Sequence, residues 1–472
     1  MNTKNRNFNR VTVIGAGVSG MALALLAQDL GMEVFVSEKR DDLAENVLQR
    51  LKNKGIPWET GGHTSRVFEA DALLLSSGIS PETFCVREAE RRGLPVVGEL
   101  DFVLPHIKGR IIGVTGSNGK STVTALCGHI LKKTGLKTAV GGNIGEAVSL
   151  FTKEFFDCVV LELSSFQLYW AHSLKSAVGI VTNLAPDHID WHGNYESYVA
   201  AKAKLLSLQD ANGWSVIQDR DRDALRIARP EKAVLLSWEE KPFHRGTNEG
   251  GTNEGGANKG GANETAGQIF MKKDRAELYL AKQEHLLFRY EETALLGRHN
   301  LENVAMALTT AYLLDVSVTN VRETLSDFLS LPHRCELAGT INGVAYVDDS
   351  KGTNVAASVT ALTSIEGRKI VILGGKGKGE DYDALAEATL REAEAAVLMG
   401  AESDRIEQAL KSVGFASIYK VAGMEEAVLT ARNLAHSGMV VLLSPACTSW
   451  DMYENYKKRG EHFCAVVQSL EK

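Results

Sequence analysis

The chain alternates short runs of β-branched and aliphatic residues with longer helical segments. The runs "VTVIG" (11–15) and "ALLLSS" (72–77) have the composition of buried strands, and helical segments such as "SGMALALLAQDLG" (19–31) lie between such runs. The same alternation restarts after "LPHIKGR" (104–110) and after "LSLPHR" (329–334). Strands that alternate with helices predict parallel sheets covered by helices. We therefore expect an α/β chain of three domains.

The length of 472 residues suits three domains, which we place at 1–107, 108–331 and 332–472. We expect a Rossmann-like domain, a central α/β domain of the P-loop ATPase type, and a second Rossmann-like domain. The degenerate repeat "TNEGGTNEGGANKGGANETA" (247–266) has almost no apolar side chains. Such a segment cannot offset the entropy of being ordered, so it predicts a flexible surface loop.

Composition narrows the class of protein. The net charge of -7 argues against a nucleic-acid or membrane-surface binder, which would need a basic face. The first ten residues lack the apolar core of a signal peptide, and no apolar run is long enough to span a bilayer. Six scattered cysteines without a C-x-x-C pair suit reduced, mostly buried thiols rather than a zinc site. We expect a cytoplasmic protein.

The first glycine turn, "GAGVSG", lies between a strand and a helix. Gly15, Gly17 and Gly20 fit G-x-G-x-x-G, and Glu38 ends the next strand. In this arrangement the backbone approaches a pyrophosphate at a helix N-terminus. The motif selects a diphosphate joined to a ribose, which NAD, FAD and a UDP-sugar all carry. Taken alone, it leaves a dinucleotide oxidoreductase open.

The second turn, "GVTGSNGKST" (113–122), resembles a phosphate-binding loop with Val114 where the usual pattern has glycine. It follows a strand and precedes an apolar helix, which is the context that such a loop requires. Gly116 and Gly119 free backbone amides to face an anion, Lys120 can reach the β- and γ-phosphates, and the hydroxyl of Ser121 can bind Mg²⁺. A P-loop switch protein without ligase activity is one alternative.

Other stretches leave their chemistry open. The lysines of "LGGKGKGED" (373–381) could bind a carboxylate or phosphate, or belong to an exposed basic loop. Glu162 ends a strand where a hard oxygen ligand for Mg²⁺ belongs, although a buried glutamate paired with lysine is the alternative. "DHIDWHG" (187–193) could be a metal cluster or a polar loop. By composition, the lysines of "YVAAKAKLL" (198–206) lie on a solvated helix face.

At "TGSNGKST" the chain resembles the Mur ligase superfamily, the ATP-dependent amino-acid ligases of peptidoglycan synthesis, which share the variant loop. Further matching motifs follow in order through all three blocks: "GGNIG", "LELSSFQL", "TNLAPDHIDWHG", "YVAAKAK", "GRHNLENVAMA", "LPHRCE", "DDSKGTN" and "SPACTSWDMYENYKKRG". Four of the motifs, "ELSSFQL", "LPHR", "DSKGTN" and "LLSPACTSWD", resemble most the member that adds D-glutamate to UDP-N-acetylmuramoyl-L-alanine. A sister ligase that adds another amino acid is the nearest alternative.

The resemblance implies a reaction and its partners. ATP phosphorylates the terminal carboxylate of UDP-N-acetylmuramoyl-L-alanine, and the amine of D-glutamate attacks the acyl phosphate. Two Mg²⁺ ions are expected, with small-molecule substrates, no nucleic acid, no membrane and a monomeric chain. The three domains would bind the UDP-substrate, ATP and the amino acid in that order along the chain.

The resemblance also assigns residues. Catalytic roles are implied for Lys120, Glu162, His188 and Lys202, and Mg²⁺ would be held by Ser121, Glu162, His188 and Lys202. Lys202 would be N-carbamylated, which requires an uncharged amine and so a lowered pKa. ATP would contact Gly116, Ser117, Asn118, Gly119, Lys120, Ser121, Thr122, Asn300, Asn303, Arg334 and Asp349. The UDP-substrate would contact Gly17, Val18, Ser19, Glu38, Arg40, Ser77, Gly78, Ile79 and Asn143, and D-glutamate would contact Lys351, Thr353, Lys378, Ser449 and Trp450.

Overall fold

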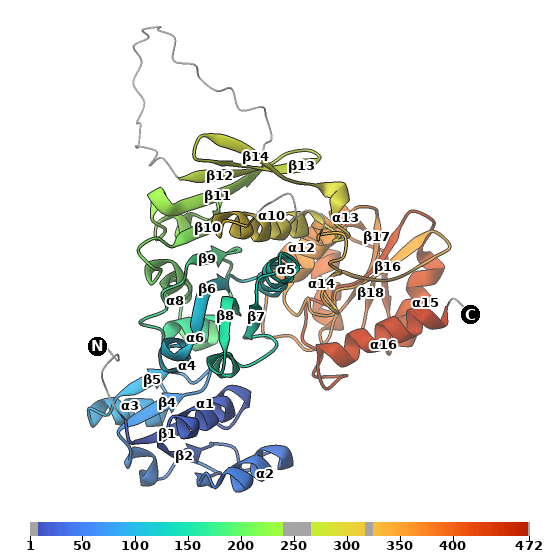
Figure 1. Ribbon diagram of the computed structural model, residues 1–472. Coiled ribbons are helices and arrows are strands. Elements are labelled where there is room, and N and C mark those ends of the chain that lie inside the picture. Colours follow the sequence, from blue (N-terminus) through green and yellow to red (C-terminus); the bar gives the residue numbers. More distant parts are fainter. Residues whose placement is uncertain (1–7, 239–265, 317–323, 471–472) are drawn as a thin grey trace, which may run out of the picture. The chain divides into compact units, whose positions relative to one another are not determined.

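The computed structural model describes residues 8–238, 266–316 and 324–470 (Figure 1). Residues 247–265 of the predicted flexible repeat lie outside the described residues. The chain divides into two compact units: the first unit is Met1–Tyr290 with Val304–Thr324, and the second unit is Glu291–Asn303 with Leu325–Lys472. The first unit contains two sheets and the second unit contains one. The three-domain α/β prediction is confirmed, whereas the domain boundaries at 107 and 331 stay a prediction.

The N-terminal sheet, blue in Figure 1, is parallel throughout, with strand order β3-β2-β1-β4-β5. Its strands are β1 (Arg10–Ile14), β2 (Glu33–Ser37), β3 (Trp58–Glu59), β4 (Ala72–Leu75) and β5 (Val96–Gly98). Its helices are α1 (Val18–Asp29), α2 (Glu45–Lys54), α3 (Phe84–Arg91) and α4 (Glu99–Val103), with the 3-10 turns η2 (Ser65–Phe68) and η3 (Leu104–His106). The strand order reverses between β1 and β4, and ligands of open α/β sheets bind at such a point.

The central sheet has the order β14-β13-β12-β11-β10-β9-β6-β8-β7. Its strands are β6 (Lys108–Thr115), β7 (Thr138–Gly142), β8 (Phe155–Glu162), β9 (Val178–Val181), β10 (Trp214–Gln218), β11 (Ala233–Trp238), β12 (Gly267–Met271), β13 (Arg275–Leu280) and β14 (Gln283–Arg289). The helical elements of this region are α5 (Lys120–Lys133), η4 (Val148–Thr152), α6 (Ser165–Tyr169), α7 (Ile189–His192), α8 (Tyr195–Ser207), α9 (Arg222–Leu225), η5 (Pro230–Lys232), η6 (Tyr290–Glu292) and α10 (Arg298–Leu313). Strands β12, β13 and β14 pair antiparallel, because their short connections can join only antiparallel neighbours.

The C-terminal sheet, orange to red in Figure 1, has the order β15-β16-β20-β17-β18-β19 and is parallel except for the β15–β16 hairpin. Its strands are β15 (Glu336–Ile341), β16 (Val344–Asp348), β17 (Lys369–Leu373), β18 (Ala393–Leu398), β19 (Ile418–Lys420) and β20 (Val440–Leu443). Its helices are α12 (Val355–Ser364), α13 (Asp383–Glu392), α14 (Ser403–Ser412), α15 (Met424–Leu434) and α16 (Tyr456–Ser469).

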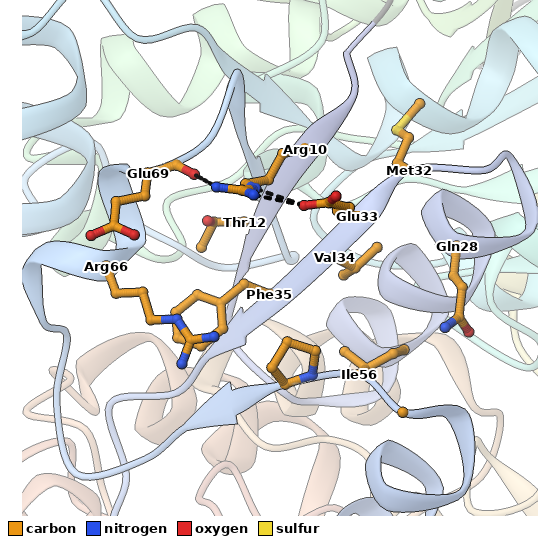
Figure 2. Close-up of a pocket in the computed structure, with 12 residues that line it drawn as sticks. Arg10, Thr12, Gln28, Met32, Glu33, Val34, Phe35, Ile56, Arg66 and Glu69 are labelled. Atoms are coloured by element: carbon orange, nitrogen blue, oxygen red, sulfur yellow. Dashed lines mark hydrogen bonds and ion pairs between the residues drawn. The ribbon is translucent and has the colours of Figure 1, made fainter.

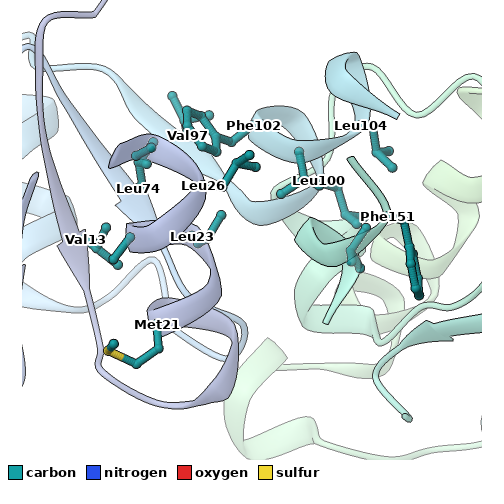
Figure 3. Close-up of a cluster of buried hydrophobic side chains, with 14 of the residues drawn as sticks. Val13, Met21, Leu23, Leu26, Leu74, Val97, Leu100, Phe102, Leu104 and Phe151 are labelled. Atoms are coloured by element: carbon teal, nitrogen blue, oxygen red, sulfur yellow. The ribbon is translucent and has the colours of Figure 1, made fainter. Parts of the chain in front are cut away.

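One hydrophobic core runs through the first unit from the N-terminal sheet to the central sheet. Figure 3 shows its side chains: Val13 and Leu23 come from β1 and α1, Leu100 and Phe102 from α4, and Phe151 from η4. Helix α4 therefore supplies buried side chains that pack toward both sheets. This shared core makes the N-terminal domain and the central domain a single packed unit.

Two expectations from composition can be compared with the fold. All six cysteines are free thiols and five of them are buried, which confirms the prediction of reduced, mostly buried cysteines. Among the helices of the described residues, none has the length and apolar character that a bilayer crossing demands.

A buried ion pair in the second unit predicts a pH-dependent stability. The Nδ1 atom of His333 lies 2.7 Å from Oδ2 of Asp348, and the hydrogen bond to this carboxylate raises the pKa of His333 above its ordinary value. A raised folded-state pKa stabilises the protein fully below the unfolded pKa, and this contribution is lost as the pH rises through the folded pKa. We expect His333→Gln to lower the melting temperature more at about pH 6 than at about pH 9.

Calorimetry at the two pH values checks this, with His462→Gln as the matched control, because Nδ1 of His462 bonds the hydroxyl of Tyr453 in an exposed pair. At the lower pH the free energy of unfolding should fall by about 1.5–3 kcal/mol, the range for hydrogen bonds to a charged group. Equal losses at both pH values would show that the Asp348 contact does not depend on protonation of His333.

Candidate functional site

The first glycine turn is shaped by close approaches of the backbone. Gly15 has a φ of +90°, and a Cβ placed there would lie 2.4 Å from Oγ of Ser76. A Cβ on Gly20 would lie 1.8 Å from the carbonyl oxygen of Gly15, which shows how closely α1 packs on the turn. Gly17, in contrast, faces open space at the start of α1. The turn therefore leaves room for an anion at a helix N-terminus.

Glu38 and Arg40 stabilise this turn. Oε2 of Glu38 accepts a hydrogen bond of 2.8 Å from the backbone N–H of Ala16, and Oε1 accepts bonds from the backbone and side chain of Arg40. Burial would raise the pKa of Glu38, but the hydrogen bonds from Arg40 and Ala16 hold it below its ordinary value. The carboxylate is thus ionised and already bonded to the turn itself.

The loop that follows β4 lies beside the glycine turn. The backbone N–H of Ser77 donates to Oγ of Ser19 over 3.3 Å, so two residues predicted to contact the UDP-substrate touch each other. Gly78 has a φ of +92° and open space on its Cβ side, and Val18 is 81% exposed. The predicted residues Gly17, Val18, Ser19 and Ser77 therefore gather where the strand order reverses.

A separate cavity of about 410 Å³ lies at the other end of the same strands (Figure 2). Arg10 and Glu33, which begin β1 and β2 and are paired in register, form an ion pair among its lining residues, and Arg66 covers the ring of Phe35 at 4.3 Å. Ligands of open α/β sheets bind at the carboxyl ends of the strands, whereas this cavity lies at their amino ends. It is therefore not the substrate site.

The phosphate loop is fastened to the segment after β9. The backbone N–H of Ser117 donates to the carbonyl of Asn183 over 2.8 Å, and that of Asn118 donates to Oδ1 of Asn183 over 3.0 Å. The hydroxyl of Ser117 also lies 2.7 Å from that of Tyr198. The sequence motifs did not predict this role for Asn183 or Tyr198, although both residues lie within the quoted motifs. They hold the loop in shape.

Lys120 begins α5 and curls over its own loop. Its Nζ atom donates to the carbonyl oxygens of Gly116 and Ser117 at 2.8 and 2.7 Å. Gly116 and Gly119 have φ angles of +140° and +81°, which favour glycine. The lysine thus lies at a helix N-terminus where backbone amides and a cation can meet a phosphate.

Glu162 ends β8, next to the phosphate loop's own strand β6. It is 2% exposed, and its Oε1 accepts a 2.9 Å hydrogen bond from Nδ2 of Asn143. Its Oε2 atom has no hydrogen-bond partner among the described residues. Burying a carboxylate oxygen without a partner costs free energy unless a cation binds it. Glu162 is therefore suited to bind a hard metal ion.

Lys202, on α8, is buried beside the phosphate loop. Its side chain is 2% exposed, and its Nζ atom donates to the carbonyl of Gly116 over 2.7 Å. Burial and the nearby charge of Lys120 lower the pKa of Lys202 well below its ordinary value. Lys204, its neighbour on the helix, instead donates to the carbonyl of Tyr169. The solvated-face interpretation of Lys202 is therefore wrong, because the helix turns this lysine inward.

His188 precedes α7 with a left-handed backbone, φ +53°. Its Nε2 atom lies 3.5 Å from Oδ2 of Asp187, and its ring packs against Phe166 at 4.8 Å. His192 bonds Oγ of Ser165, and burial lowers its pKa to about 4, which keeps it neutral near neutral pH.

The second unit holds the other nucleotide-binding candidates. Asn303 donates to Oδ1 of Asn300 over 3.1 Å, and both side chains are buried. Asp349 accepts a 2.7 Å hydrogen bond from Ser444, and burial raises its pKa to about 7. The charge of Arg334 acts on Asp349, opposing this rise.

The residues predicted for D-glutamate lie on three loops of the second unit. Nζ of Lys351 lies 3.9 Å from the ring centre of Tyr456, and Oγ of Ser449 is buried without a partner among the described residues. The loop of Lys378 is joined to the loop of Ser449, because Lys376 and Thr448 exchange backbone hydrogen bonds of 2.9 and 3.0 Å. Trp450 is 66% exposed.

Arg459, for which the sequence predicted no role, connects two of these loops. This buried side chain donates to Oγ and the carbonyl of Ser350 at 3.0 and 2.9 Å, and to the carbonyl of Cys447 at 3.1 Å. A buried arginine on α16 is unusual unless it is paired, and the only sequence signal for it was its place in "NYKKRG".

Comparison with known families assigns each part of the chain. Residues 10–85 match the model of the MurD N-terminal domain, 114–311 the Mur ligase middle domain, and 333–447 the Mur ligase glutamate ligase domain. Among curated relatives, UDP-N-acetylmuramoylalanine–D-glutamate ligase of Salinibacter ruber is 36% identical, with 98% of each chain covered. The ligase of that name from Pelotomaculum thermopropionicum is 34% identical, also with 98% of each chain covered.

Solved structures share the fold at low identity. A UDP-N-acetylmuramate–alanine ligase of Thermotoga maritima has a TM-score of 0.58 and 18% identity, covering 98% of this chain and 100% of its own. A MurF ligase of the same organism, solved in complex with ADP, has a TM-score of 0.55 and 14% identity, covering 92% and 94%. These two structures support the fold alone.

Proposed function

The chain belongs to the Mur ligase family, and we propose that it joins D-glutamate to UDP-N-acetylmuramoyl-L-alanine at the expense of ATP. The observation that carries this is the match along nearly the whole chain to relatives named for that reaction, at identities of 34–36%. The dinucleotide oxidoreductase and the P-loop switch protein are excluded, because neither uses all three matched domains. The product is a precursor of peptidoglycan.

The first chemical step activates a carboxylate. An oxygen of the terminal L-alanine carboxylate attacks the γ-phosphorus of ATP, the bond to the β,γ-bridging oxygen breaks, and ADP leaves an acyl phosphate behind. Both reactants are anions, so neutralising charge and positioning dominate catalysis. The proposed groups are the Lys120 ammonium and the amides at the start of α5, which lie together at the carboxyl end of β6.

Magnesium fits the residues of this edge of the central sheet. The unpartnered Oε2 of Glu162 supplies a hard oxygen, and Ser121 supplies a hydroxyl at the start of α5. His188, a poorer ligand for Mg²⁺, lies beside the Asp187 carboxylate. When bound, the two expected ions would neutralise phosphate charge and orient the γ-phosphoryl group.

We propose that Lys202, as a carbamate, supplies a further anionic group beside Glu162. An uncharged amine adds to carbon dioxide to give a carbamate and a proton, and only the neutral form of lysine can do so. The lowered pKa of Lys202, which burial and Lys120 cause, favours that form. The resulting carbamate would place negative charge beside Lys120 and near Glu162.

The second step forms the amide. The neutral amine of D-glutamate attacks the acyl carbon, the bond from that carbon to the phosphate oxygen breaks, and the proton released from the nitrogen passes to the departing inorganic phosphate. The carboxylates of D-glutamate would be held by Lys351, Thr353, Lys378 and Ser449. Ammonium and hydroxyl donors bind carboxylates well, and the buried Oγ of Ser449 has no partner among the described residues.

Phosphate release from ATP and UDP-N-acetylmuramoyl-L-alanine tests the assignment, with D-glutamate added or replaced by alanine, diaminopimelate or a dipeptide. Release that requires D-glutamate supports the proposal. Release that requires one of the other amino acids would identify a sister ligase. We also propose that the enzyme is monomeric, which gel filtration tests. Its small-molecule substrates suit an enzyme of the cytoplasm, which cell fractionation tests.

A further inference from the structure

The loop of Ser77, Gly78 and Ile79, called here the diphosphate loop, is anchored residue by residue. Oγ of Ser77 donates to the buried carboxylate of Glu99 over 2.5 Å, and the same carboxylate oxygen accepts from Gln167 on α6 over 3.0 Å. The carbonyl of Gly78 accepts from Nε1 of Trp191 over 3.0 Å. The carbonyl of Ile79 accepts from Nε1 of Trp170, also over 3.0 Å.

These anchors come from the segments that carry the proposed metal ligands. Gln167 and Trp170 follow Glu162 by five and eight residues, and Trp191 follows His188 by three. The three anchoring side chains thus connect the N-terminal domain, where the UDP group is expected, to the loops of the central domain that border the phosphate loop.

The hydrogen bond from Trp191 and two successive ring contacts connect Gly78 to His188. The indole of Trp191 packs on Phe166 with ring centres 4.9 Å apart, and Phe166 packs on the imidazole of His188 at 4.8 Å. Trp191 also contacts Tyr169 and His192 at 5.2 and 4.5 Å. The indole is therefore held from several sides, so that its N–H keeps one direction.

Trp170 is fixed in the same way at the second anchor. A Cβ placed on Gly98 would lie 2.4 Å from Cβ of Trp170, so the glycine at the end of β5 is what lets the tryptophan approach. Its ring packs against the buried cluster of the N-terminal domain that includes Ile14 and Leu75. Phenylalanine could fill the same space, but it has no N–H for the carbonyl of Ile79.

We propose that Trp191 and Trp170 are positioning residues that couple binding of the UDP-linked substrate to the arrangement of the nucleotide site at His188. Ordering of the diphosphate loop by its substrate would hold Trp191, and through Phe166 would restrict the imidazole of His188. Because coupling is reciprocal, a bound nucleotide with Mg²⁺ would strengthen binding of the UDP-linked substrate by the same factor. This inference rests on the proposed substrate.

The test is calorimetric titration of UDP-N-acetylmuramoyl-L-alanine into the full chain, with and without a non-hydrolysable ATP analogue and Mg²⁺. In the unmodified protein the analogue should tighten binding by about 5-fold or more, the lower end of typical coupling. In Trp191→Phe, which keeps a ring but removes the donor, this factor should fall toward one. The KM for the UDP-linked substrate should rise by about 2- to 10-fold, the loss of one hydrogen bond, with little change in kcat.

Trp58→Phe is the matched control, since Trp58 packs against the core of the same domain and makes no contact with the diphosphate loop that the structure records. Trp170→Phe should have a weaker effect than Trp191→Phe, because the ring of Trp170 is connected to His188 only indirectly, through Tyr169 and then Trp191. The proposal is overturned if the analogue does not tighten binding in the unmodified protein, or if Trp191→Phe and Trp58→Phe keep the same factor. Since binding is measured without turnover, a failure of the proposed amide-forming reaction shows separately in the phosphate assay.

Discussion

Lys202→Ala is expected to lower kcat by about 10²- to 10³-fold, the effect of removing one preorganised charge from a reacting centre. The lysine is 2% exposed and its amine lies within hydrogen-bond reach of the phosphate loop at Gly116. Its lowered pKa favours the carbamate, whose two oxygens the alanine variant lacks. Acetate or formate should restore part of the activity, because a small carboxylate can enter the space that the side chain leaves.

Lys204→Ala separates this role from a general effect on α8. It removes an ammonium group from the same helix, but one that donates to the carbonyl of Tyr169 instead of the phosphate loop. We expect this variant to keep nearly the unmodified rate, because the ammonium group that it loses does not bond the phosphate loop. Full activity of Lys202→Ala, or no increase in its activity when a small carboxylate is added, would contradict the proposed carbamate on Lys202.

Lys120→Ala should have the largest effect, a fall in kcat of about 10³-fold or more, as for other cations that contact a transferred phosphoryl group. The ammonium group of Lys120 now bonds two carbonyls of its own loop and lies at the N-terminus of α5. An alanine leaves the amides of the loop but removes the charge that meets the γ-phosphate. ADP formation with both substrates present measures the loss.

Lys132→Ala, in the last turn of the same helix, is the control for α5, since its loss removes only a favourable charge at the helix C-terminus. Its rate should be nearly unchanged. If Lys120→Ala kept a tenth or more of the activity while binding nucleotide normally, the loop would hold ATP without taking part in phosphoryl transfer.

Motifs predicted the edge of the central sheet well, because spacing within a strand-turn-helix unit is local. The turn at Gly116 to Ser121 follows β6 and Glu162 ends the neighbouring strand β8, as the strand pattern predicted. The carboxyl ends of neighbouring parallel strands meet at one edge, so these residues gather without any further information.

Contacts between distant segments could not be predicted in this way. The sequence around Glu99 contains no pattern that predicts its hydrogen bonds with Ser77 and Gln167. The hydrogen bonds that the indole N–H groups of Trp170 and Trp191 donate depend on how two domains pack. Composition even pointed Lys202 toward solvent, because lysines of an amphipathic helix usually lie on its solvated face.

Strands β15 and β3 were among those not predicted from the sequence. The hairpin β15–β16 turns at Asn342 and Gly343, whose φ angles are +50° and +75°. Asn-Gly is a strong signal for a two-residue hairpin turn, so β15 could have been predicted from the sequence. Strand β3 has two residues and pairs with β2, so it is too short to show the alternation of a strand in the sequence.

The claim that a carboxylate is activated as an acyl phosphate is tested most directly by an isotope. UDP-N-acetylmuramoyl-L-alanine with heavy oxygen in both positions of its terminal carboxylate is turned over with ATP and D-glutamate, and the released phosphate is analysed by mass spectrometry. The account predicts one heavy oxygen in each phosphate and one in each new amide. Phosphate free of the label, formed together with amide, would contradict it.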